Sequence, residues 1–193
     1  FKNILDKQHF NITKQLVDKD TPSMDLPPEL HLCLYLQGKF FTDDINFLPY
    51  SKFISTFNAF KREKYYKLAK KRFGRVELND YLDKAKTEIT TTAGEIRKTN
   101  VTPDDITRYY TKYARKVDVF GIGVALQNML QQKKDKDANV FATFSNKTFP
   151  IIMSTTVSNA VALDPDERYT IENLRTQMVR LMQLTNHTTK LYP

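Results

Sequence analysis

KVDVFGIGVAL, at residues 116–126, is the stretch that decides the fold of this chain. Apart from Lys116 and Asp118, its residues are apolar or glycine, so a helix formed here would carry almost no polar face. Helices of that kind lie in the centre of a domain. We therefore predict a central helix that begins at Asp118, with the aspartate as its N-cap. Glycine costs about 1 kcal/mol relative to alanine inside a helix, so Gly121 and Gly123 indicate close approach of a neighbouring backbone.

Two shorter stretches accompany this helix. LPPEL occupies residues 26–30, and LDPDERYT occupies residues 163–170. Proline fixes its own φ and biases the preceding residue toward extended backbone, so both stretches predict loops or turns. The second stretch leads into an amphipathic pattern that predicts a final helix over residues 168–184.

The three stretches resemble, in the same order, three motifs of the protein-kinase large lobe. These are the Pro-Pro-Glu that closes the activation segment, the central helix that starts Asp-Val-Trp-Ser-Leu-Gly-Val, and the Asp-Pro-x-x-Arg-x-Thr turn before the last helix. Pro28 matches the second proline of the first motif, and Gly123 matches the glycine of the second. The resemblance implies a mainly α fold, a kinase-like large (C-terminal) lobe over residues 1–193 with the N-terminal lobe absent. It also implies a helical insertion over residues 37–116.

The roles that this resemblance implies are structural. Asp118 would accept hydrogen bonds from backbone N–H groups of the catalytic loop, and Phe120 stands where the family has tryptophan. Glu29 would pair with Arg168 in a buried, bidentate bridge that ties the activation segment to the base of the lobe. Removing one partner of such a buried pair would cost about 3–5 kcal/mol.

The chain lacks most of the groups that phosphoryl transfer needs. Its five glycines form no Gly-x-Gly-x-x-Gly, and no His-Arg-Asp occurs. Asn3 and Asp18 are the candidate metal-binding residues, although Lys19-Asp20 stands where the family has Phe-Gly. An asparagine in a loop and an aspartate in a turn are the alternative explanations. We therefore expect no cofactor in this chain, and ATP with Mg²⁺ only in an intact parent whose small lobe and catalytic loop lie upstream.

Three functions stay open at this point. The first is the large-lobe part of a serine/threonine kinase that, when intact, transfers phosphate from ATP to a protein substrate. The second is a catalytically inactive, kinase-like scaffold that binds a protein partner, for example in a virus particle. The long insertion, the Pro-Pro-Glu spelling and the Lys/Asn-rich composition are similar to kinases of large cytoplasmic DNA viruses. The third function is nucleic-acid binding by a basic helical module.

Composition adds limits to these interpretations. The 193 residues suffice for one domain with a real core, and the formal net charge of +8 suits acidic or phosphate-rich partners. Much of the excess charge lies in residues 60–75, a pattern typical of a solvated amphipathic helix and also of nucleic-acid binding. Cys33 is the only cysteine, which excludes an internal disulfide and indicates a reducing compartment. No apolar run is long enough to span a membrane, and we expect an intracellular protein, cytoplasmic or virion-associated.

Local patterns predict the remaining elements. They predict a short hairpin within residues 1–20 and a loop over 21–29. A helix over 30–36, stopped by Gly38, and a helix starting at Thr42 follow. The next predicted elements are a helix over 51–73 ended by Gly74, a helix over 76–98, and a helix with Thr102 as N-cap and Pro103 as its first residue. In its apolar surroundings, the Cys33 thiol should have a raised pKa and be a poor nucleophile.

Overall fold

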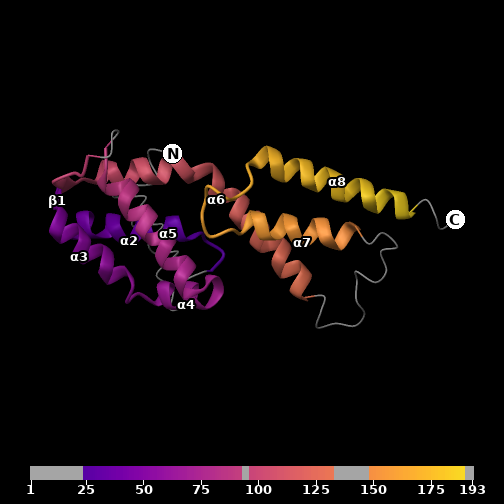
Figure 1. Ribbon diagram of the computed structural model, residues 1–193, viewed down its shortest axis with the longest axis horizontal. Coiled ribbons are helices and arrows are strands. Elements are labelled where there is room, and N and C mark those ends of the chain that lie inside the picture. The colour runs from indigo at the N-terminus through magenta and orange to yellow at the C-terminus, as the bar shows by residue number, and fades with distance from the viewer. Residues whose placement is uncertain (1–23, 93–95, 133–147, 190–193) are drawn as a thin grey trace. The chain divides into compact units, whose positions relative to one another are not determined.

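The computed structural model describes residues 24–92, 96–132 and 148–189, and these form helices with one small sheet (Figure 1). The prediction of a mainly α fold is confirmed, and the kinase-like lobe stays a prediction. The elements in chain order are α2 (Pro28–Asp43), β1 (Leu48–Pro49), α3 (Tyr50–Phe60), α4 (Lys64–Phe73), α5 (Arg75–Thr90), β2 (Asn100–Val101), α6 (Pro103–Gln132), α7 (Thr148–Ala160) and α8 (Ile171–Thr189).

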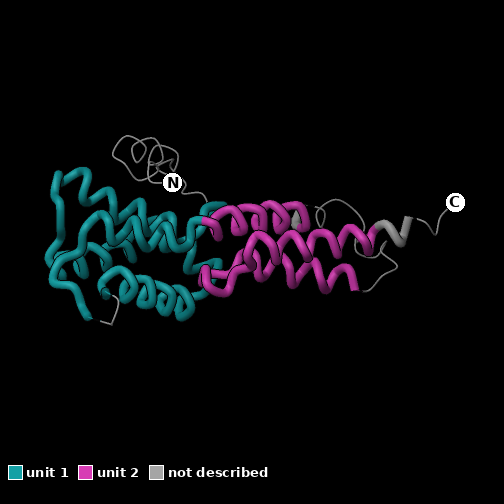
Figure 2. The backbone as a smooth tube through the Cα atoms, turned by 90° about the horizontal axis from the view of Figure 1, so that it is seen from above, with its two compact units in different colours: residues 1–114 teal, residues 115–193 magenta. Residues whose placement is uncertain are grey.

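The chain divides into two compact units, residues 1–114 and residues 115–193 (Figure 2). The boundary falls inside helix α6, between Ala114 and Arg115. The predicted insertion over residues 37–116 is not tested by this division and stays a prediction.

The first unit has a core of apolar side chains from α2, α3, α5 and the start of α6. Its fully buried large residues are Leu32, Leu36, Phe40, Phe53, Phe57, Leu78, Leu82, Ile89 and Ile106. The antiparallel pair β1 and β2 aligns Leu48 with Val101. The Tyr50 N–H adds a hydrogen bond of 2.8 Å to the Thr99 carbonyl oxygen, so the strand pair fastens the start of α3 to the segment before α6.

Helix α2 is longer at both ends than predicted. It begins at Pro28, because proline is tolerated in the first turn, where its missing N–H is not needed. It continues through Gly38 to Asp43 and ends at Asp44, whose backbone is left-handed with a φ of 51°. The prediction that Gly38 stops the helix is wrong. Burial of Leu36 and Phe40 on either side outweighs the roughly 1 kcal/mol cost of a helical glycine.

The predicted helix start at Thr42 is also wrong. Thr42 lies in the last turn of α2, and its Oγ1 donates a 2.6 Å hydrogen bond to the Gly38 carbonyl oxygen. Threonine hydroxyls form such bonds within helices and also cap helix N-termini, so the residue type alone did not distinguish the two positions.

The basic region forms two helices where one was predicted. Helix α3 ends at Phe60 and α4 begins at Lys64, so the predicted helix over 51–73 is interrupted. The predicted end at Gly74 is confirmed, because this glycine has a φ of 91° that other residues rarely adopt.

The next predicted helix, over 76–98, ends early at Thr90. Thr91 then forms an isolated antiparallel bridge with Arg97. Threonine is β-branched and favours extended backbone, which accounts for the early end. The predicted start of α6 at Pro103 is confirmed.

In the second unit, α7 and α8 pack together, and a buried cluster joins Val119 of α6 to Ala160 and Leu174. The prediction of a new helix with Asp118 as N-cap is wrong, because α6 runs unbroken from Pro103 to Gln132. No proline lies between these ends to interrupt it. The predicted burial on all sides is not met either, since Ile122 and Met129 are 40% and 60% exposed.

No helix within the described residues has an apolar stretch long enough to cross a membrane. The hairpin predicted within residues 1–20 lies outside the described residues, as do the candidate metal ligands Asn3 and Asp18.

Candidate functional site

A buried arginine, Arg168, organises the turn before α8. Its side chain is 2% exposed, and its Nε donates a 2.7 Å hydrogen bond to the Ala162 carbonyl oxygen. One terminal nitrogen donates to the Leu163 carbonyl oxygen at 3.1 Å. The guanidinium carbon lies 4.8 Å from the centre of the Phe120 ring. A planar guanidinium can bond in its plane and stack on its face at once, so this one cation connects the turn to α6.

The turn around Arg168 has its own polar framework. Asp164 Oδ1 accepts a 2.9 Å hydrogen bond from the Asp166 N–H, which is the geometry of an Asx turn. Thr170 Oγ1 accepts a 3.1 Å hydrogen bond from the Asn173 N–H, so Thr170 is the N-cap of α8. The predicted final helix is present, with its start at Ile171 instead of Arg168.

Gly123 allows α6 to approach the end of α7. A Cβ atom built on Gly123 would lie 2.6 Å from the Ala160 Cβ and 2.8 Å from the Val161 Cγ1, closer than such atoms can approach. A Cβ on Gly121 would meet nothing within 4 Å. The prediction of close approach is therefore confirmed for Gly123 and wrong for Gly121.

Two further contacts of this region were missed by sequence reasoning. Lys116 Nζ donates to the backbone carbonyl oxygen of Arg168. Asn159 Nδ2 donates a 3.0 Å hydrogen bond to the Tyr169 hydroxyl. The residue type of Lys116 gave no sign of a backbone partner.

In the first unit, Glu29 is fully buried in the first turn of α2, directly after Pro28. An acidic residue is favourable there because the helix dipole is positive at its N-terminus. Burial, with a smaller contribution from the charge of Glu29, raises the pKa of the Cys33 thiol well above its ordinary value. This confirms the expected direction for Cys33 and leaves it a poor nucleophile.

Two predicted roles stay predictions. Glu29 and Arg168 are each buried, but they belong to different units, so the bridge between them is not tested. Asp118 is exposed in the middle of α6, and its proposed contact with a catalytic loop is not tested either.

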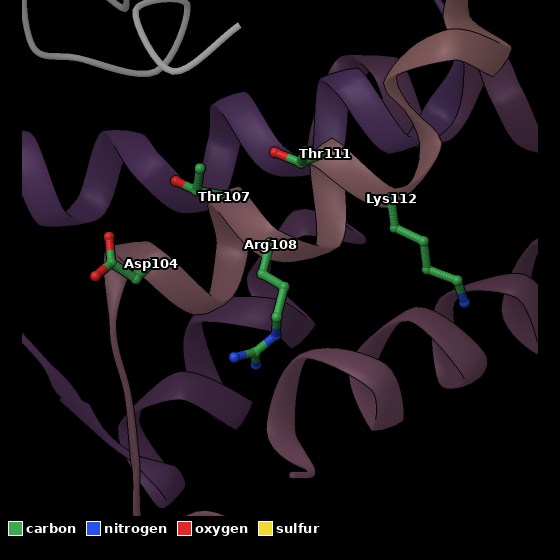
Figure 3. A pocket seen from close by; sticks show the side chains of 5 residues that line it. All are labelled: Asp104, Thr107, Arg108, Thr111 and Lys112. Atoms are coloured by element: carbon green, nitrogen blue, oxygen red, sulfur yellow. The ribbon is translucent and has the colours of Figure 1, made fainter. Parts of the chain in front are cut away.

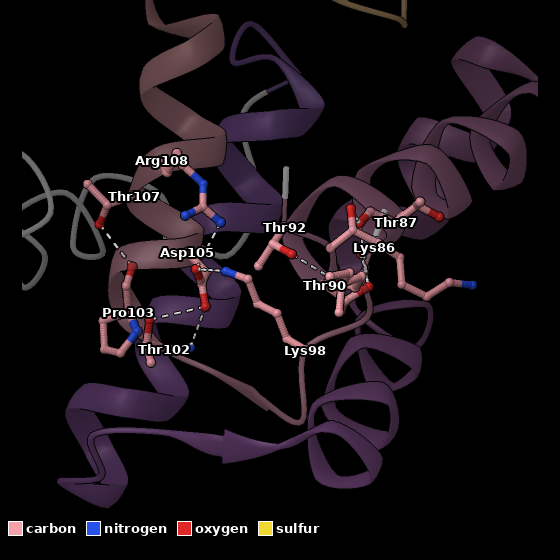
Figure 4. A network of polar contacts seen from close by, with 12 residues as sticks. Lys86, Thr87, Thr90, Thr92, Lys98, Thr102, Pro103, Asp105, Thr107 and Arg108 are labelled. Carbon is pink, nitrogen blue, oxygen red and sulfur yellow. Dashed lines mark hydrogen bonds and ion pairs between the residues drawn. The ribbon is translucent and has the colours of Figure 1, made fainter. Parts of the chain in front are cut away.

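The N-terminus of α6 carries a polar network centred on Asp105 (Figure 4). Asp105 Oδ2 accepts hydrogen bonds from the Thr102 N–H and Oγ1 at 3.0 and 3.1 Å, and Oδ1 accepts from Lys98 Nζ and from Arg108 at 2.9 Å. Burial opposes ionisation of this carboxyl, but the hydrogen bonds from Lys98 and Thr102 outweigh it and lower its pKa. Sequence reasoning missed the network, although the Thr-x-x-acid spacing of 102–105 is that of a capping box.

A second set of hydrogen bonds joins α2 to the N-terminal end of α6. Gln37, which is 1% exposed, donates from Nε2 to the Pro103 carbonyl oxygen at 3.0 Å and to Thr107 Oγ1 at 3.2 Å. The Thr107 hydroxyl in turn donates to the Pro103 carbonyl oxygen at 3.0 Å. These bonds fix the register of the two helices within the first unit.

An open surface pocket of about 520 Å³ lies on the outer side of α6 (Figure 3). Its lining residues are Asp104, Thr107, Arg108, Thr111 and Lys112. Both cations of the pocket already have carboxylate partners. Arg108 contacts Asp105 at 2.9 Å, and Lys112 Nζ lies 2.9 Å from Glu88 Oε2. The pocket is therefore close to electrically balanced and has no surplus charge for an anionic ligand.

Within the described residues, no group of three or more histidine, cysteine, aspartate or glutamate side chains is arranged to hold a metal ion. No family model, curated protein or solved structure matches this chain.

Proposed function

We propose that this chain is the large-lobe part of a serine/threonine protein-kinase-like protein, which in intact form transfers phosphate from ATP to a protein. The observation that carries the proposal is the contact between Arg168 and the Phe120 ring. The two residues come from two of the three motifs that resemble the kinase family. A chance likeness of short motifs gives no reason for the aromatic of one to stack on the arginine of the other.

Other positions of the same motifs support the proposal through their local roles. Gly123 stands at a close helix approach, and Thr170 caps the last helix after the Asp-Pro turn. Glu29 is a buried acid at the start of a helix, in keeping with the structural role that the resemblance gives it. In this proposal the chain supplies the structural base and the docking surface for a protein substrate. ATP and Mg²⁺ would be bound with residues of the parent, together with Asn3 and Asp18.

The test is phosphate transfer by the natural polypeptide that contains this sequence, isolated from its source and identified by mass spectrometry. We expect an upstream glycine-rich loop and catalytic aspartate, and transfer of labelled γ-phosphate from ATP to serine or threonine of a protein acceptor. The 193-residue chain alone is the matched control and should transfer none. A natural polypeptide that lacks those residues and transfers no phosphate would contradict the proposal.

The second candidate is a catalytically inactive, kinase-like scaffold, in the cytoplasm or in a virus particle. One observation favours it. Exposed large apolar side chains concentrate on the helices of the second unit, where a protein partner could cover them. They are Ile122, Met129, Ile151, Ile171, Val179 and Met182. The same assay decides between the candidates, since a scaffold transfers no phosphate even with its complete sequence.

A further inference from the structure

Helix α4 presents a face made of lysines. Lys64, Lys67, Lys70 and Lys71 are exposed, whereas Tyr65, Tyr66 and Ala69 of the same helix are buried. Positions 64, 67 and 71 are separated by three and four residues and so share one side of the helix. Arg62 before the helix and Arg75 after it are also exposed, whereas Lys61 and Arg72 are half-buried. The helix is therefore anchored by its aromatic side and carries its cations outward.

These four lysines differ from three lysines elsewhere in the first unit, which have carboxylate partners. Lys86, Lys98 and Lys112 form ion pairs with Asp83, Asp105 and Glu88. Among the described residues, none of the four α4 lysines forms one. Helix α4 itself contains no acidic residue, and the exposed Glu63 at its N-cap offsets only part of the charge of the four lysines. Like charges held close together in excess over their counter-charges favour binding of a polyanion.

We propose that this face of α4 binds the phosphate backbone of nucleic acid without reading its sequence. From Lys64 to Lys71 the helix rises about 10 Å, a length over which one DNA strand presents about three phosphates. A protein partner would need apolar or aromatic anchors, and a membrane surface would need apolar residues to insert. Within the described residues, the exposed large apolar side chains all lie outside α4. This binding is independent of the phosphate-transfer function proposed above.

Fluorescence anisotropy with a labelled 20-base-pair DNA duplex, between 50 and 200 mM NaCl, tests the proposal. The α4 variant carries Lys64→Gln, Lys67→Gln, Lys70→Gln and Lys71→Gln. The matched control removes the same charge at four exposed cations elsewhere, Lys52→Gln, Arg115→Gln, Arg175→Gln and Arg180→Gln. We expect the wild type and the control variant to bind. The slope of log K against log salt should become shallower by about 3 in the α4 variant, about 0.9 for each phosphate that the protein no longer neutralises.

The outcomes separate the alternatives. No binding of the wild type at 50 mM salt, or equal weakening in the control variant, would overturn the proposal. Tighter binding of poly-glutamate than of the duplex, abolished in the α4 variant, would overturn it in favour of an acidic protein partner. Circular dichroism checks the fold, and glutamine should preserve the helix because its helix propensity is close to that of lysine. If the quadruple variant does not fold, the double variant Lys64→Gln with Lys71→Gln should still make the slope of log K against log salt shallower by about 2.

Discussion

At Arg168 the shape of the cation matters as much as its charge. We expect Arg168→Lys to lower the free energy of unfolding by about 2 kcal/mol, because lysine cannot donate to two carbonyl groups and stack on Phe120 together. Urea denaturation followed by circular dichroism measures the change. The control Arg180→Lys, at an exposed position of α8, should stay within about 0.5 kcal/mol of the wild type. Equal stability of the two variants would contradict the structural role of Arg168.

Replacing either glycine of α6 with alanine should change the stability of the protein, in opposite directions for the two positions. Gly123→Ala places a Cβ against Ala160 and Val161 and should destabilise the protein by about 1–3 kcal/mol. Gly121→Ala meets no neighbour and should stabilise it by about 1 kcal/mol, through better helix propensity. Thermal denaturation of the two variants and the wild type shows which of the three proteins is the most stable and which the least. A stabilising Gly123→Ala would show that α6 and α7 are not in close contact.

At the scale of elements, the start of α6 depends on Asp105. Asp105→Ala removes the acceptor of the Thr102 N–H and leaves Lys98, whose side chain is 13% exposed, without its carboxylate. We expect a loss of about 3 kcal/mol in the free energy of unfolding. The matched control is Asp83→Ala, which removes a more exposed ion pair with Lys86 and should cost no more than about 1 kcal/mol. Similar losses in both variants, measured by urea denaturation, would contradict a special role for Asp105.

The same carboxylate predicts a dependence of stability on pH. Its pKa is lower in the folded chain than in the unfolded chain, so its contribution is complete above the unfolded value of about 4. That contribution is lost as the pH falls through the folded value. In urea denaturation between pH 7 and pH 2, we expect the advantage of the wild type over Asp105→Asn to shrink below about pH 4. A gap between the wild type and Asp105→Asn that stays constant from pH 7 to pH 2 would refute the mechanism.

Sequence patterns predicted the elements whose boundaries depend on backbone chemistry. Gly74 ends α4 because of its positive φ, and Pro103 starts α6 because proline suits the first turn. The patterns failed where burial decides. Gly38 remains helical between buried neighbours, and Asp118 lies inside a continuous helix although its side chain could cap one. Propensities describe each residue alone, whereas packing involves residues that are distant in the sequence.

The candidate site was predictable only in part, for the same reason. The motifs pointed to Phe120, Gly123 and Arg168, because each residue type has few substitutes for its role. The carbonyl partners of Arg168, at Ala162 and Leu163, are backbone atoms that no residue type indicates. The Asp105 network was signalled by its capping-box spacing, but its partner Lys98 lies before the helix and follows no helical pattern.

At the scale of the whole molecule, the resemblance predicts energetic coupling between Glu29 and Arg168. In a double-mutant cycle of Glu29→Gln and Arg168→Met, we expect a coupling free energy of about 1–3 kcal/mol, as for two groups that share an ion pair. Urea denaturation of the wild type, the two single variants and the double variant measures the four free energies of unfolding that the cycle needs. The control cycle pairs Glu29→Gln with Arg180→Met and should be additive within about 0.5 kcal/mol. Additivity in the first cycle would contradict the Glu29–Arg168 bridge that the kinase-like lobe requires.

Helix α6 crosses the boundary between the two units, and this affects how the chain can be divided. Boundaries between domains usually lie in exposed linkers, where proteases cut. Here the boundary peptide after Ala114 is helical, so it should resist cleavage. A gene truncated there would encode only 12 of the 30 residues of α6, a length at which an isolated helix is marginal. If the gene were split at this point, each of the two protein fragments would contain only part of α6. The complete helix would form only when the two fragments associate with each other.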